Sequence, residues 1–232
     1  MKGMKLSLAI ALMVGLAVGM GRAVHAAVLF EQVPSAGGTA FISSPPVLLT
    51  GDPGYRQADS FQLSQDAVVR DLHWWGNKSE KYLNAGGSYT LVDDYNFTLT
   101  VYEDADGLPG DVFYQTTGNP SRSDGMRPDV TWDRYFELVL GTPFSVQAGV
   151  TYWLSIYSDI QNHLWGWQAV AGGAHATRAT TATGDSGAWT ASPDVDLAFR
   201  VTGDFSAVPE PATLALLGLG LAGLGFSRRR TR

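Results

Sequence analysis

The stretch NFTLTVY, residues 96–102, alternates apolar and polar side chains. Phe97, Leu99 and Val101 fall on one face of an extended chain and the threonines on the other, because successive side chains of a β-strand point to opposite sides. The pattern therefore predicts a β-strand with one buried face.

Similar alternation recurs between residues 28 and 205, where no long helical periodicity is present. The clearest further strands are predicted over residues 134–140, 151–157 and 196–202, and weaker ones over 27–33, 60–63, 67–75, 112–115 and 164–169. Segments rich in Gly, Pro, Asn and Asp separate them, and these residues favour turns. Many short strands joined by such turns predict an all-β fold, a single jelly-roll-like β-sandwich over residues 27–205.

The N-terminus predicts a secretory signal peptide over residues 1–26. Lys2 and Lys5 precede an apolar run over residues 6–18, and small residues and the tripeptide Val-His-Ala at 24–26 follow it. We expect cleavage after Ala26 rather than a retained anchor, because the run is shorter than the about 17 to 25 residues that a spanning helix needs.

The charge of the middle of the chain differs from that of the whole. Of the 16 Lys and Arg, three lie before residue 27 and four after residue 207, which leaves nine against 21 acidic residues; the middle therefore carries a formal charge of −12, compared with −6 for the whole chain. An acidic domain repels the phosphate backbone of DNA and RNA. We therefore expect no nucleic-acid partner.

The chain contains no cysteine, which in an exported protein excludes a disulfide framework, a thiol nucleophile and a thiolate metal site. It also lacks the His-Glu-x-x-His and Gly-x-Ser-x-Gly patterns of zinc proteases and serine hydrolases. We therefore expect a protein that is not an enzyme and has no cofactor. A polysaccharide-active enzyme with a pair of carboxylates is an alternative, because such a pair meets only in the folded chain.

Acidic side chains concentrate between residues 103 and 111. Asp104, Asp106 and Asp111 could offer hard oxygen ligands to Ca²⁺, although the spacing is not that of an EF-hand. The alternative is a solvated hairpin loop whose carboxylates form turn hydrogen bonds.

Two tryptophans suggest a further alternative function. Trp165 and Trp167 lie two residues apart and so on the same face of a strand. Exposed, their rings would form the sugar-binding surface of a carbohydrate-binding module. Buried, they would fill the core, where large aromatic side chains dominate the packing.

The composition changes over residues 206–232. An extended motif at 208–212 comes first, because proline cannot continue a helix, and an apolar run rich in Leu and Gly at 212–226 predicts a short transmembrane helix. A basic cluster at 228–232 would stay on the cytoplasmic side of the membrane. The motif contains Pro209, Glu210 and Pro211, and the cluster contains Arg228, Arg229 and Arg230.

This order of motif, helix and basic cluster resembles the PEP-CTERM sorting signal of bacteria that possess an exosortase, a membrane-embedded processing enzyme. The resemblance implies that Pro209, Glu210 and Pro211 are the recognition site for that enzyme. It implies export through the inner membrane, transient anchoring by the helix, and final placement at the cell surface or in the extracellular matrix. It also implies association with exopolysaccharide, because such signals tend to occur in bacteria that make it.

The stretch FTLTVYEDADGLPG, residues 97–110, resembles a strand-turn segment of exported bacterial β-sandwich proteins.

Overall fold

The computed structural model describes residues 26–35, 39–49, 51–124, 133–170, 178–182, 188–192 and 195–206. The predicted signal peptide, apart from Ala26, and the predicted sorting tail, apart from Ser206, lie outside these ranges. Within the described ranges every regular element is a strand, and no helix is long and apolar enough to cross a membrane.

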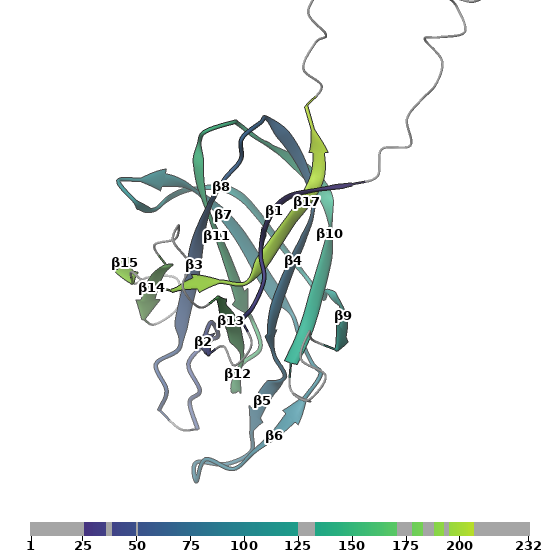
Figure 1. Ribbon diagram of the computed structural model, residues 1–232. Coiled ribbons are helices and arrows are strands. Elements are labelled where there is room, and N and C mark those ends of the chain that lie inside the picture. The colour runs from purple at the N-terminus through teal and green to yellow at the C-terminus, as the bar shows by residue number, and fades with distance from the viewer. Residues whose placement is uncertain are drawn as a thin grey trace, which may run out of the picture.

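The described chain forms seventeen strands in three sheets, and every strand pairing is antiparallel (Figure 1). The strands are β1 (Ala27–Gln32), β2 (Ala40–Ile42), β3 (Tyr55–Gln62), β4 (Ala67–Asn77), β5 (Ser79–Tyr82), β6 (Tyr89–Val92), β7 (Phe97–Ala105), β8 (Leu108–Gly118), β9 (Ser121–Asp124), β10 (Asp133–Val146), β11 (Thr151–Ser158), β12 (His163–Leu164), β13 (Gly166–Val170), β14 (Arg178–Ala182), β15 (Thr190–Ser192), β16 (Asp196–Leu197) and β17 (Phe199–Phe205).

Two large sheets make up most of the molecule. The first has the order β1-β17-β4-β10-β9, with β2, β13 and β16 attached through β13; the second has the order β15-β14-β3-β11-β7-β8. A third, small sheet has the order β12-β5-β6. The chain passes repeatedly from one large sheet to the other, and the two sheets face each other across a shared core.

Aromatic side chains from both large sheets fill that core. Trp74 of β4 meets Phe97 of β7 edge to face with ring centroids 5.2 Å apart, and Phe97 meets Phe136 of β10 at 5.4 Å. Leu72 and Leu154, one from each sheet, are fully buried in the same cluster. The all-β prediction is therefore confirmed, whereas the jelly-roll order of connections stays a prediction.

The predicted strands correspond closely to observed ones. Residues 96–102 lie in β7 apart from Asn96, residues 134–140 in β10 and residues 151–157 in β11. Residues 196–202 are divided between β16, which pairs with β13, and β17, which pairs with β4. Ala198 lies between the two strands: its N–H donates to the carbonyl of Gln168, and its carbonyl accepts the N–H of Trp75. Strands β2, β5, β6, β9, β14 and β15 were not predicted from the sequence.

Both ends of the described chain lie at the same end of the two large sheets (Figure 1). Ala27 of β1 pairs with Gly203 of β17, and the N–H of Ser206 donates to the carbonyl of Asp66, next to the first residue of β4. The last residue of β4, Asn77, leads directly into the small sheet at the other end. At about 3.3 Å per residue, the eleven residues of β4 separate the two ends by roughly 33 Å.

Candidate functional site

The small sheet begins as a hairpin whose turn is built by Asn84. The Asn84 side-chain oxygen accepts the backbone N–H groups of Gly86 at 2.9 Å and Ser88 at 3.3 Å. Gly87 has a φ of 79°, a left-handed conformation that glycine adopts without a steric penalty. The turn therefore directs β6 back along β5, where Glu80 pairs with Leu91 and Tyr82 with Tyr89.

The register of the small sheet gathers five side chains on one of its faces. Glu80 lies between Leu164 of β12 and Leu91 of β6, and residues that pair directly across antiparallel strands point to the same side. Tyr82 and Tyr89 form the next row, with ring centroids 5.7 Å apart. We call this surface the distal face. It comprises Glu80, Tyr82, Tyr89, Leu91 and Leu164, of which Tyr89 is 52% and Leu91 43% exposed.

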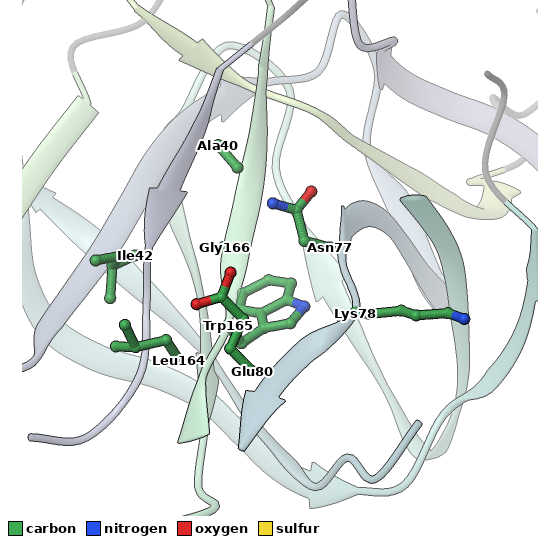
Figure 2. Close-up of a pocket in the computed structure, with 8 residues that line it drawn as sticks. All are labelled: Ala40, Ile42, Asn77, Lys78, Glu80, Leu164, Trp165 and Gly166. Carbon is green, nitrogen blue, oxygen red and sulfur yellow. The ribbon is translucent and has the colours of Figure 1, made fainter. Parts of the chain in front are cut away.

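The distal face continues into a cavity of about 180 Å³ at the junction with the first large sheet. Figure 2 shows the Trp165 ring at its centre, with Glu80 in front of the ring in this view, Ile42 and Leu164 on one side, and the Lys78 side chain directed away. Its polar and apolar walls are formed by Ala40, Ile42, Asn77, Lys78, Glu80, Leu164, Trp165 and Gly166.

Trp165 forms the floor of this cavity and also belongs to the core. Its ring contacts Phe97 edge to face at a centroid distance of 4.8 Å and is 1% exposed. The ring lies directly on Gly76 of β4, where a Cβ would be 2.4 Å from Trp165 Cζ2. Glycine at position 76 is therefore required for this packing.

Glu80 is the acidic group of the site. The Tyr82 hydroxyl donates to its Oε2 at 3.4 Å, a long hydrogen bond, and no ion pair to Glu80 occurs within the described residues. Burial raises the pKa of the Glu80 carboxyl, and the hydrogen bond from Tyr82 opposes this only in part. A partly desolvated carboxylate with so weak a partner can accept further donors, such as hydroxyl or ammonium groups.

An ion pair fastens the small sheet to the rest of the molecule. Asp93, which follows β6, accepts Arg134 Nε at 2.9 Å and Arg134 Nη2 at 3.1 Å, a bidentate pair. The hydrogen bond from Arg134 is the main reason that the pKa of Asp93 lies below its usual value. On the other side of the sheet, His163 Nδ1 lies 3.2 Å from Ser79 Oγ, and burial lowers the pKa of His163.

The tryptophans predicted as an alternative sugar-binding surface do not form one. Trp165 is 1% exposed and Trp167 is fully buried, and both belong to the central core. Trp167 also donates its Nε1–H to the carbonyl of Ala198 at 2.9 Å. Of the two alternatives that the sequence left open, the structure therefore shows the second, in which both indole rings fill the core, as large aromatic side chains commonly do.

The acidic residues predicted as calcium ligands occupy a hairpin. Asp106 and Gly107 have φ of 54° and 80° and form the two-residue turn between β7 and β8. Asp104 accepts Trp153 Nε1 at 2.7 Å with one oxygen and the N–H of Gly107 at 3.3 Å with the other. Over the described ranges, no three or more His, Asp or Glu side chains are arranged to hold a metal ion. This includes the predicted ligands Asp104, Asp106 and Asp111.

His73 illustrates how titratable groups serve the packing of the large sheets. Its Nδ1 lies 2.7 Å from the Tyr135 hydroxyl and its Nε2 3.1 Å from Thr202 Oγ1, so the ring links three neighbouring strands. Burial is the main cause that lowers the pKa of His73. The buried Asp59 similarly accepts the backbone N–H groups of Ser60 and Leu197, at 2.7 and 2.6 Å.

The sequence did not identify the distal face. Two signals in it were available: the turn residues Asn84–Gly87, and the alternation of Tyr89 and Leu91 that follows them. These local signals could not have identified Leu164, because it joins the face from more than 70 residues away in the sequence.

The residues predicted to direct sorting lie outside the described residues: Pro209, Glu210 and Pro211 of the motif, and Arg228, Arg229 and Arg230 of the basic cluster.

Comparisons with known proteins identify two parts of the chain. A family model described as a domain of unknown function, DUF7901, matches residues 30–202. A model of the PEP-CTERM protein-sorting motif matches residues 207–230, directly after the folded domain. No curated protein and no solved structure matches the chain.

Proposed function

Because the chain belongs to the DUF7901 family and carries a PEP-CTERM sorting motif, we propose that it is an exported, non-enzymatic protein of the cell surface or extracellular matrix. The observation that carries the proposal is the motif match at residues 207–230. The motif implies processing by an exosortase, and in this proposal the apolar run 212–226 anchors the protein in the membrane until then. The mature domain then associates with exopolysaccharide.

The hydrogen bonds of the buried polar side chains support a non-catalytic role. The buried groups that could perform acid–base chemistry, such as His73 and Asp59, hold neighbouring strands together by hydrogen bonds. Asp104 likewise holds Trp153 and a turn. Groups engaged in this way stabilise the domain, and we propose that stability outside the cell is what they provide.

The proposal is tested by following the tail in the producing cells. The mass of the mature chain is measured in cells with and without their exosortase, and for a variant with Pro209, Glu210 and Pro211 all replaced by Ala. We expect loss of the tail only when both the enzyme and the motif are intact. Loss of the tail without the exosortase would contradict the proposal, as would release of reducing ends when the purified protein is incubated with the polysaccharide of its host.

A further inference from the structure

The distal face has the composition of a binding surface rather than of a sheet edge in solvent. Tyr89 and Leu91, which are 52% and 43% exposed, leave about half of their surface open to solvent on it. Beside these apolar groups lie Glu80, whose one described hydrogen bond is 3.4 Å long, and the amide of Asn77 in the cavity wall. Apolar surface with a few convergent polar groups is typical of small-ligand sites.

We propose that the distal face and its cavity bind one sugar ring of an extracellular polysaccharide, an inference that rests on the proposed function and names the surface responsible. The C–H face of the ring packs against Tyr89 and Leu91, which lie beside the cavity, and ring hydroxyls donate to the Glu80 carboxylate, which belongs to both the face and the cavity wall. The cavity of about 180 Å³ is smaller than the roughly 300 to 1,000 Å³ of sites for drug-sized ligands, so it suits a single ring. The open side of the face leaves room for the polymer to continue.

Two other occupants fit the face less well. A second copy of the chain, related by two-fold symmetry, would bring two Glu80 carboxylates to the same interface, and like charges that lose water repel strongly. A nucleic acid would meet a domain with a formal charge of −12. A neutral ligand rich in hydroxyl groups avoids both costs and supplies Glu80 with donors in addition to the long hydrogen bond from Tyr82.

The position of the face agrees with this role. The sorting motif follows the end of β17, whereas the small sheet lies at the opposite end of β4 (Figure 1). A domain attached at the β17 end would present the distal face away from its point of attachment. The polymer would therefore reach the face before the protein is released.

The experiment measures binding of the purified protein, as the cells produce it, to the polysaccharide of its own host and to the monosaccharides from its acid hydrolysis. Isothermal calorimetry gives the affinity for the polymer, and chemical shift changes locate the monosaccharides. We expect Glu80→Gln to weaken polymer binding about tenfold or more, since hydrogen bonds to a charged group are about twice as strong as neutral ones. Tyr89→Ala should abolish binding, whereas Tyr89→Phe, which keeps the ring, should retain it.

Matched controls come from the two large sheets, outside the distal face. Glu103→Gln changes an exposed carboxylate and Val139→Ala an exposed apolar side chain, and both should leave binding unchanged. Thermal unfolding of each variant confirms that it is folded. Unchanged binding in Glu80→Gln and Tyr89→Ala would overturn the inference while leaving export and tail processing intact. A dimer that Tyr89→Ala dissociates would assign the face to a second copy and would equally overturn it.

Discussion

Gly76 is the residue on which the floor of the cavity depends. Gly76→Ala would place a methyl group 2.4 Å from Trp165 Cζ2, so the indole or strand β4 must move. We expect the free energy of unfolding to fall by about 1 to 3 kcal/mol, as for other overpacked cores, and Trp165 fluorescence to change. Urea titration measures the loss of stability.

Gly141→Ala is the matched control for this substitution. A Cβ at position 141 would have no heavy atom within 4 Å, so its effect on the urea midpoint should be close to zero. Equal midpoints for the two variants would show that the Trp165 ring can move away from Gly76 at no cost.

Buried histidines predict a loss of stability on mild acidification. The pKa of His163 and that of His73 both lie below 6.5 in the folded protein because burial disfavours the charged ring. The unfolded chain therefore binds more protons as the pH falls below about 6.5, and stability decreases until the folded pKa is reached. The raised pKa of Glu80 acts in the opposite direction over part of this range.

A single variant separates the contribution of His163 from the others. His163→Asn keeps a polar side chain near Ser79 but does not titrate. Between pH 7.5 and 5, the urea midpoint of this variant should fall less than that of the unchanged protein. An identical fall in both would remove His163 as a cause of the acid sensitivity.

Among the elements, the small sheet depends most on the ion pair at its base. Arg134→Lys replaces the bidentate pair with Asp93 by a single contact, and Asp93 is 41% exposed, so solvent screens part of the loss. We expect the opening free energy of β5 and β6 to fall by about 1 kcal/mol. Hydrogen exchange of the amides in β5 and β6 measures it, with those in β7 as an internal reference.

A second arginine provides the comparison for that experiment. Arg70 pairs with Asp204 at the opposite end and its side chain is 50% exposed, so Arg70→Lys should not change exchange in β5 or β6. If both variants accelerate exchange there equally, the small sheet does not depend on the Asp93–Arg134 pair.

The same elements show how far the sequence predicts the structure. In β7 and β11 every second residue belongs to the central core, and the sequence displays this period of two directly, although the opposite face of both strands is also largely buried. Strand β5 has no such signal, because its residues Ser-Glu-Lys-Tyr are polar or amphipathic and its partner β12 lies about 80 residues away. The candidate site was missed for the same reason: it is formed by pairing between distant segments.

At the scale of the whole molecule, the end of β17, after which the tail follows, and the position of the distal face predict an orientation on the cell. In cells that lack the exosortase the protein should stay tethered by its tail, with the β5–β6 hairpin farthest from the membrane. The chain contains no cysteine, so a single introduced cysteine reports the exposure of one site. Ala85 at the hairpin tip and Ala148 near the tail end are both exposed alanines.

Labelling with a bulky maleimide then tests this orientation. In the purified protein Ala85→Cys and Ala148→Cys should react at similar rates, because both side chains are exposed. On intact tethered cells the reagent should reach Ala85→Cys several times faster, since the membrane crowds the end from which the tail leaves. Equal rates on cells would mean that the domain turns freely on its tether, so that the distal face gains no advantage from lying opposite the tail.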